Sequence, residues 1–176
     1  MPPREAKQLF DQVGFDGPIA LTSNVDSGNQ QWVEVTCQMI QKSLQHPCVF
    51  QPQTTLGEFR GALNSRSITS VYRTAWVAGF PSIENFLNPL FRTGGAGDVG
   101  QYTNPEVDDL LKRADAAPSQ QQAHALYQQA ERIAVKDMQT IPIWYQSATA
   151  AWSSRLHHVQ PTLFRELDYT TVTVSR

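Results

Sequence analysis

Apolar, strand-like segments alternate with helical ones through the early part of this 176-residue chain. The segments "PIALTSNV" (18–25) and "CVFQPQ" (48–53) have strand composition, and a longer apolar run covers 67–80. Between them, 27–46 and 55–66 carry apolar residues at helical spacing. The order strand, helix, strand, helix, strand predicts an α/β fold, with a mixed sheet flanked by helices.

Residues that favour the ends of helices mark several helix boundaries. Thr55 and Glu58 have the spacing of a capping box. The other predicted boundaries are Gly14 after a helix from Arg4, Ser82 before 83–91, Asn104 and Pro105 before 106–117, and Pro118 and Ser119 before a helix to about Lys136. After these helices, 141–153 is expected to be extended and 167–174 to be a strand.

Composition indicates a globular domain of ordinary size. Hydrophobic residues make up 40% of the chain and charged residues 17%, which disfavours disorder. The formal net charge is −2 and there is no basic block, so a nucleic-acid partner is not expected. The N-terminal stretch has no apolar core of a secretory signal. The chain is therefore either cytoplasmic or a piece of a longer protein.

Cys37 and Cys48 are the two cysteines of the chain. The pattern places Cys37 on a helix and Cys48 at the start of the next strand. A disulfide between them is one alternative if the protein is exported, and two buried thiols are the other. Two cysteines and four scattered histidines have no zinc-binding spacing, so no metal is expected.

No motif in the sequence indicates catalysis, a nucleotide site or another cofactor. The glycine-rich stretch 93–103 follows a helix rather than a strand, and it is interpreted as a surface loop. Asp108 and Asp109 are adjacent on a helix, so their side chains diverge, as is typical of a solvated face. His157 and His158 are interpreted as surface residues. The protein is not expected to be an enzyme.

Arg73 and Trp76 stand within the apolar run 67–80, close to Gly79. If the strand pairs regularly, their side chains lie on opposite faces. An arginine in such a run marks an ion pair, a sheet edge or a ligand, and a tryptophan offers a flat apolar wall with one donor. The alternative is that Trp76 is a core residue and that Arg73 pairs with an internal carboxylate.

The stretches "AWVAGFPSIENFLNPLF" (75–91), "YTNPEVDDLLKRA" (102–114) and "LYQQAERIAVKDMQTIPIWY" (126–145) occur here in a characteristic order. Together they resemble the extracellular solute-binding proteins of peptide-type ABC importers. This is the dipeptide- and oligopeptide-binding family, also called bacterial solute-binding protein family 5. The glycine-rich loop before the Asn-Pro pair resembles the actinobacterial branch.

The resemblance implies one lobe of a type II periplasmic-binding-protein-like fold. Members of the family are longer and close two lobes around a ligand. Residues 1–176 resemble only the later part, so they are expected to be a single α/β lobe excised from a two-lobed parent. The parent is expected to be extracellular and anchored as a lipoprotein.

The resemblance also places ligand-binding residues on the run that contains Trp76: Arg73, Ala75, Trp76, Val77, Gly79 and Phe80. Peptide binders of the family carry an aspartate three residues after the tryptophan, where it pairs with the peptide's α-amino group. Here that position is Gly79. Arg73 matches a position that meets the ligand's carboxylate in some oligopeptide binders, and an arginine fork suits that role.

The resemblance implies an importer's substrate-binding component that takes oligopeptides or a related solute. Blocked peptides, small metabolites and oligosaccharides stay open as ligands, because Gly79 replaces the amino-binding acid. The expected partners are the solute, the permease subunits and the missing lobe of the parent. The alternatives are a sensory receptor of the same fold and, less favoured, a small α/β enzyme.

Overall fold

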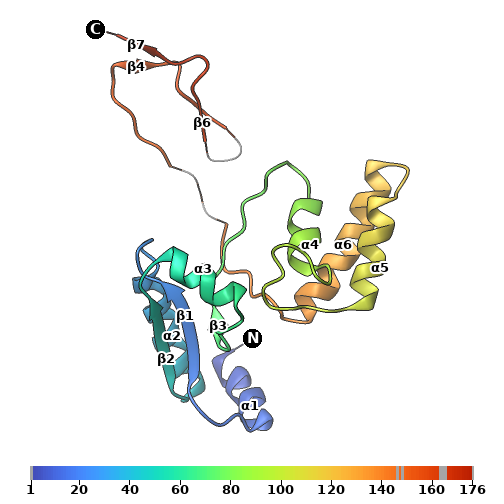
Figure 1. The fold of residues 1–176 in the computed structure, drawn as a ribbon. Helices are drawn as coiled ribbons and strands as arrows, with labels where there is room; N and C mark the ends of the chain where they lie inside the picture. The colour runs from blue at the N-terminus through green and yellow to red at the C-terminus, as the bar shows by residue number, and fades with distance from the viewer. Residues whose placement is uncertain (1, 146, 148, 163–165, 176) are drawn as a thin grey trace. The chain divides into compact units, whose positions relative to one another are not determined.

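The computed structural model describes residues 2–145, 147, 149–162 and 166–175. The chain divides into two compact units, Met1–Ala75 and Trp76–Arg176 (Figure 1). Unit 1 holds a parallel sheet with three helices, and unit 2 holds three further helices followed by short strands. The single lobe expected for 1–176 stays a prediction.

The sheet of unit 1 confirms the predicted strand and helix order. It consists of β1 (Ile19–Asn24), β2 (Cys48–Gln53) and β3 (Val71–Tyr72) in the spatial order β2-β1-β3. Both neighbours run parallel to the central strand, with Leu21 opposite Phe50 on one side and Val71 on the other. The expected mixture of directions is absent from this sheet. Among the residues that the structure describes, antiparallel pairing occurs only in two short ladders of unit 2.

The helices of unit 1 are α1 (Pro3–Val13), α2 (Gln30–Leu44) and α3 (Leu56–Asn64). Helix α1 ends as predicted at Gly14, whose φ of 64° is left-handed and suits glycine. The capping box of α3 is confirmed: Thr55 Oγ1 accepts from Glu58 N–H at 3.1 Å, and Glu58 Oε2 accepts from Thr55 N–H at 3.1 Å.

A disulfide joins Cys37 on α2 to Cys48 at the start of β2. Of the two states left open by the sequence, the structure thus has the disulfide. Cys37 is buried and packs with Leu21 and Val33 in the small core between helix and sheet. The bond crosslinks α2 to an edge strand, which fixes the helix over the sheet.

The predicted strand over 67–80 is wrong in its length. Only Val71 and Tyr72 pair in the sheet, and the last bond toward β1 is donated by Arg73 N–H to Thr22 O at 2.9 Å. The chain then passes into unit 2 at Trp76. There its polar groups bond to a helix rather than to a strand, so the ladder ends.

Unit 2 is built on α4 (Glu84–Phe91), α5 (Pro105–Asp115) and α6 (Gln120–Lys136). As predicted, Asn104 caps α5 by accepting from Glu106 N–H, and Ser119 caps α6 by accepting from Gln122 N–H. Helix α4 begins one residue later than predicted, although Ser82 Oγ still accepts from Glu84 N–H at 3.2 Å. The core joins all three helices through buried residues that include Leu87, Val107, Leu111, Tyr127 and Ala130.

Two antiparallel ladders follow these helices. Strand β4 (Leu156–His157) pairs with β7 (Thr173–Val174), and β5 (Gln160–Pro161) pairs with β6 (Leu167–Asp168). The strand expected over 167–174 is therefore two strands, because Asp168 Oδ1 accepts from Thr170 N–H at 2.9 Å and turns the chain. The described residues of 141–153 form no strand. His157 and His158 are exposed, as expected.

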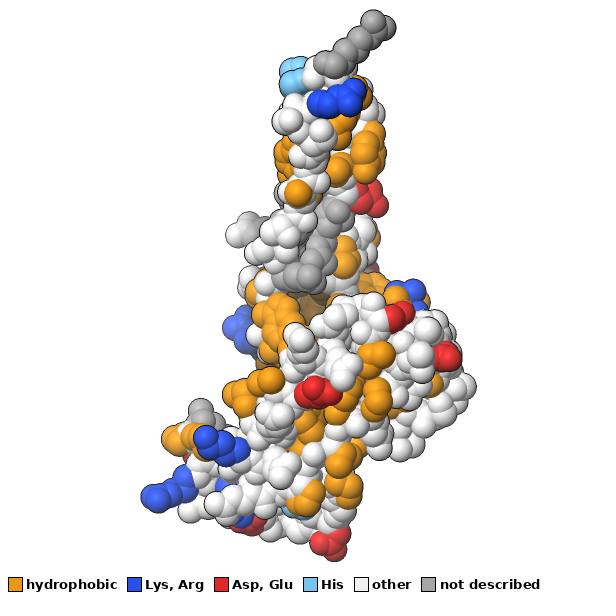
Figure 2. All heavy atoms as spheres, turned by 90° about the vertical axis from the view of Figure 1, so that its left-hand side faces the viewer, with side chains coloured by type: hydrophobic (Ala, Val, Ile, Leu, Met, Phe, Trp, Pro, Cys, Tyr) orange, Lys and Arg blue, Asp and Glu red, His pale blue; other side chains and the backbone are white. Residues whose placement is uncertain are grey.

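Hydrophobic side chains reach the surface in both units, with few acidic and basic ones between them on the face in Figure 2. Trp144 and Tyr145, beyond α6, are 57% and 101% exposed. Among the helices that the structure describes, none has the length and apolar character needed to cross a membrane.

The disulfide should stabilise unit 1 measurably. Its loop is short, with a sequence separation of 11, so loop closure contributes about 2 to 3 kcal/mol. We expect the double variant Cys37→Ala, Cys48→Ala to lose about this free energy of unfolding in urea titrations. Dithiothreitol should lower the stability of the wild type and leave the variant unchanged. Equal urea midpoints for oxidised wild type and variant would contradict this.

Candidate functional site

The six predicted ligand-binding residues are divided between the two units. Arg73 and Ala75 end unit 1, whereas Trp76, Val77, Gly79 and Phe80 begin unit 2. All except the half-buried Arg73 are exposed, and Trp76 and Phe80 keep exposed fractions of 38% and 42%. The structure holds no ligand, so their role stays a prediction.

Asn85 of α4 fixes the segment from Trp76 to Gly79. The Trp76 Nε1–H donates to the backbone oxygen of Asn85 at 2.6 Å. The Gly79 N–H donates to Asn85 Oδ1 at 2.7 Å. One residue therefore holds the segment at two points, which gives it a defined shape where the sheet no longer pairs it. No motif or spacing in the sequence indicated this role for Asn85.

Trp76 also lies against the glycine-rich loop. A Cβ at Gly97 would lie 2.9 Å from Trp76 Cζ3 and 3.1 Å from Leu90 Cδ2, so only glycine permits this approach of the ring. The loop is tied down, because Gly97 N–H donates to Pro89 O at 2.9 Å and Tyr102 N–H donates to Asp98 Oδ1 at 2.8 Å. Gly97 therefore lets the loop lie directly against the Trp76 ring.

Gly79 has open space where a side chain would be. No atom lies within 4 Å of the position that a Cβ would take, and its backbone is outside the left-handed region. Neither packing nor backbone conformation therefore demands a glycine here. An acidic side chain would fit at this position, so its absence affects the chemistry of the segment rather than its fold.

Arg73 lies at the edge of the sheet without an ionic partner. No carboxylate of a described residue pairs with its guanidinium, so the internal ion pair considered from the sequence is not found. Burial lowers the pKa of the Arg73 guanidinium below its usual range. A half-buried cation of this kind is suited to a carboxylate from outside the chain.

A buried polar cluster at the carboxyl end of β1 escaped the sequence analysis. Thr22, Ser23 and Asn24 are buried in succession at the end of the central strand. Asn24 Nδ2 donates to Asp26 Oδ1 at 2.6 Å and to Ser27 Oγ at 2.9 Å. Asp26 Oδ2 in turn accepts from Leu56 N–H, at the start of α3, at 3.0 Å.

Two polar atoms of this cluster have no partner among the described residues: Asn24 Oδ1 and Asn29 Nδ2. Asn29 is buried, and its Oδ1 accepts from Trp32 Nε1–H at 3.2 Å. A buried acceptor and a buried donor without partners are costly unless water or a ligand completes them. The run Thr-Ser-Asn at the end of an otherwise apolar strand is the sequence signal that could have indicated this cluster. Ligands bind at the carboxyl ends of parallel strands.

The described residues of the cluster are mostly hydroxyl and amide side chains, with Asp26 as the one carboxylate. No group of three or more His, Cys, Asp or Glu suited to a metal occurs in the described part of the chain. The carboxylate of Asp26 is already used, since hydrogen bonds from Asn24 and then from the Leu56 backbone lower its pKa below the ordinary value. The free groups are neutral amides, which suit a hydrogen-bonding organic ligand.

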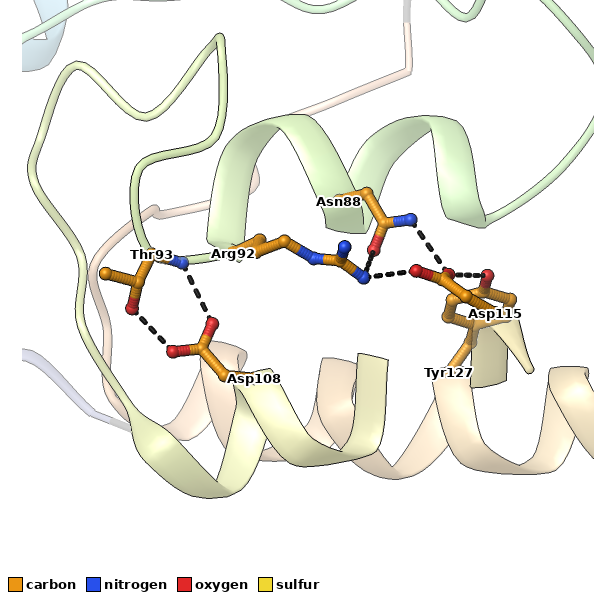
Figure 3. Close-up of polar contacts among 6 residues, drawn as sticks. All are labelled: Asn88, Arg92, Thr93, Asp108, Asp115 and Tyr127. Carbon is orange, nitrogen blue, oxygen red and sulfur yellow. Dashed lines mark hydrogen bonds and ion pairs between the residues drawn. The ribbon is translucent and has the colours of Figure 1, made fainter. Parts of the chain in front are cut away.

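Asp115 ties together the helices that position Asn85 (Figure 3). It accepts from Asn88 Nδ2 at 3.0 Å and from the Tyr127 hydroxyl at 2.6 Å, and it pairs with Arg92. Burial tends to raise the pKa of Asp115, but these bonds outweigh it and the pKa lies below its ordinary value. Burial and then the Asp115 bond raise the pKa of Tyr127.

A second link joins α5 to the start of the glycine-rich loop. Asp108 accepts from the backbone N–H of Thr93 at 2.9 Å and from its hydroxyl at 2.6 Å (Figure 3). Asp108 was interpreted as part of a solvated face, and the structure instead gives it this partner. Asp109 does lie on the solvated face of α5, where it forms an ion pair with Arg113 on the next helical turn.

The fold combines a parallel sheet with helices, and the carboxyl end of the central strand is polar and buried. No family model matches the chain. It is 28% identical over 143 residues to the probable deoxycholate-binding periplasmic protein YgiS of Escherichia coli, covering 80% of this chain and 26% of YgiS. It is 26% identical over 147 residues to the periplasmic murein peptide-binding protein MppA of the same organism, with the same two shares.

Solved structures agree with these relatives. The chain superposes over its whole length on 35% of the pheromone receptor PrgZ, with a TM-score of 0.81 and 19% identity. In sequence and in fold it is related to the peptide-binding solute-binding proteins, as the motifs predicted. It spans between a quarter and just over a third of the length of these proteins. The expected actinobacterial origin has no support from these relatives.

The Asp115 network should make unit 2 sensitive to acid. Its contribution is complete above the ordinary carboxyl pKa of 3.8, and it is lost as the pH falls through the lowered pKa of the folded state. We expect Asp115→Asn to destabilise unit 2 at pH 7 by about 1 to 2 kcal/mol, because the charge-assisted bonds are lost.

The difference in melting temperature between wild type and Asp115→Asn should shrink as the pH is lowered from 6 to about 3. Comparison with the variant separates Asp115 from Asp137 and Asp168, whose pKa values are also lowered. A difference that stays constant with pH would show that the charge of Asp115 contributes nothing. The matched control is Asp109→Asn, which removes an exposed pair on the same helix.

Proposed function

We propose that the chain is a ligand-binding part of a solute-binding protein that serves an ABC importer. Sequence and fold relatives that are named as binding proteins support this, among them the peptide-binding MppA. The observation that carries the proposal is the pair of unpartnered buried atoms, Asn24 Oδ1 and Asn29 Nδ2, at the carboxyl end of the sheet.

Peptide groups suit this pair of atoms. A peptide unit offers one N–H donor and one C=O acceptor, which complement the Asn24 acceptor and the Asn29 donor. Asn24 ends β1 and Asn29 immediately precedes α2, so both asparagines belong to one strand-to-helix connection, where the proposed ligand binds. A related solute with neighbouring hydroxyl and carbonyl groups satisfies the same two atoms.

The residues predicted from the resemblance are further candidates for ligand contact, each within its own unit. Arg73 binds a carboxylate of the solute, since its own charge has no partner among the described carboxylates. Within unit 2, Trp76, Val77 and Phe80 offer an exposed apolar wall to the solute. Gly79 leaves this wall without the acid that holds an α-amino group in peptide binders of the family.

The lack of an acid at Gly79 favours ligands that bring no free ammonium to this place. N-blocked peptides, small metabolites and oligosaccharides meet this condition. So does a peptide whose amino group is held by another lobe. A buried ammonium without a carboxylate partner would lose several kcal/mol relative to one that is paired.

The setting that we propose follows from the same family. The protein is exported, and its parent is anchored as a lipoprotein and closes a second lobe over the solute. The permease subunits of the importer are the partners that receive the solute. No enzymatic activity is proposed, since the relatives named above are binding proteins.

A sensory receptor of the same fold is the second candidate. The similarity to the pheromone receptor PrgZ, which superposes on the whole chain, favours it. Both candidates bind a solute in the same place. They differ in whether the protein passes the solute to a permease or signals its presence.

The asparagine pair gives the direct test of solute binding. Asn29→Asp keeps the Oδ1 that accepts from Trp32 and replaces the free donor by an acceptor, which repels a ligand carbonyl. We expect the affinity of the 176-residue chain for N-acetylated tripeptides to fall about tenfold, the cost of one lost and one repulsive contact. NMR titration of the labelled chain measures this affinity in the weak range.

Gln38→Glu is the matched control for this test. It makes the same amide-to-acid change on an exposed position of the same helix, α2, and should leave the affinity unchanged. If Asn29→Asp binds the tripeptides as well as the wild type, the sheet end is not the solute site and the proposal is wrong.

Gly79→Asp should restore recognition of a free amino group. The side chain has open space, so the fold should tolerate the change. We expect the variant to bind free tripeptides about tenfold more tightly than the wild type, as for a hydrogen bond to a charged group, with no gain for N-acetylated ones. Isothermal titration at two salt concentrations measures the affinities for the free and the N-acetylated tripeptides. Gly79→Asn controls for the size of the added side chain. Equal gains for the two peptide forms would contradict an ammonium contact.

A further inference from the structure

A hollow of about 390 Å³ lies within unit 2, between the segment after Trp76 and α6. Ala78, Phe80, Ile83 and Phe86 form its apolar side, and His124 and Gln128 of α6 face them. Its volume is within the range of small-ligand sites, which are mostly apolar with a few polar groups. No Asp, Glu, Lys or Arg is among its described lining residues.

The walls of this hollow are formed in advance of any ligand. Ile83 packs against the core of the three helices. Asn85 holds the neighbouring segment by its bonds to Trp76 and Gly79 at 2.6 and 2.7 Å. Phe80 and Phe86 nevertheless keep exposed fractions of 42% and 39%, so apolar surface is left open to a ligand.

We propose that this hollow is a subsite for an uncharged apolar group of the solute, such as an aromatic or branched aliphatic side chain. Asn85 is its positioning residue, because it shapes the segment without lining the hollow. The inference rests on the proposed function, since Ala78 and Phe80 adjoin or belong to the predicted ligand segment. A charged group is excluded because the apolar lining would strip its hydration and offer no counter-charge.

Two small probes test the class of ligand. We expect N-acetyl-L-phenylalaninamide to shift the backbone amide signals of 78–86, His124 and Gln128 in NMR titrations of the 176-residue chain. N-acetyl-L-lysinamide should bind at least about tenfold more weakly, because its ammonium finds no partner. Equal affinities for the two probes, or shifts confined to other residues, would overturn the proposal.

Filling the hollow supplies the second measurement. Ala78→Leu places a larger side chain in it and should weaken binding of the phenylalanine probe about tenfold. Ala116→Leu, at the exposed end of α5, makes the same change outside the hollow and should have no effect. Unchanged binding by Ala78→Leu would overturn the assignment of the subsite.

The role of Asn85 is tested by two substitutions. Asn85→Ala removes the acceptor for Gly79 N–H and should weaken binding of the phenylalanine probe about tenfold. Asn85→Asp keeps an oxygen at this position and should restore binding of the probe. A purely structural role would lower the melting temperature without this pattern of loss and rescue. If Asn85→Ala does not fold, Ala78→Leu decides alone.

Failure of this subsite is distinguishable from failure of the proposed function. The subsite lies in unit 2, and the asparagine pair lies in unit 1. If Asn29→Asp weakens tripeptide binding while the phenylalanine probe binds nowhere in 78–86, the solute-binding function stands and the subsite is wrong. If instead the phenylalanine probe binds at 78–86 and Asn29→Asp leaves tripeptide binding unchanged, the subsite stands and the proposed contacts at the sheet end are wrong.

Discussion

The parallel pairing of β1 on both of its edges is the constraint on which unit 1 depends. It buries the central strand, and with it the three polar residues from Thr22 to Asn24. A buried polar group must find a partner, and most of these do. Thr22 bonds to Gln51 and Ser70, and Ser23 donates to the Asn24 backbone oxygen. The Asn24 Nδ2 donates to Asp26 and Ser27. Asn24 Oδ1 and Asn29 Nδ2 have no hydrogen-bond partner among the described residues, and the proposed solute supplies one to each.

In unit 2 the segment that follows the sheet is held by a helix, α4. The described residues 74–79 pair with no strand, and Asn85 instead accepts hydrogen bonds from Trp76 and Gly79. Asn85 itself is placed by α4, which the Asp115 network ties to α5 and α6. The aromatic wall at Trp76 thus depends on helix packing, and this dependence gives the exposed segment a fixed shape.

The helix ends and the strand order could be predicted because they are encoded locally. Thr55 with Glu58, Asn104 with Pro105, and Ser119 each cap a helix through bonds between near neighbours in sequence. The extent of the third strand could not be predicted in this way. Apolar composition suits a strand as well as a segment held by a helix, and only the change of partner after Arg73 distinguishes them.

By itself the sequence determined the α/β order of unit 1, the helices of unit 2 and the resemblance to solute-binding proteins. Those properties are carried by periodicity, caps and short motifs, which act over a few residues. The tertiary structure decided that Cys37 and Cys48 are joined, that Asn85 positions Trp76, and that Asn24 and Asn29 are buried without partners. Each of these depends on which distant segments lie side by side, because burial and hydrogen-bond partners arise only when the chain packs.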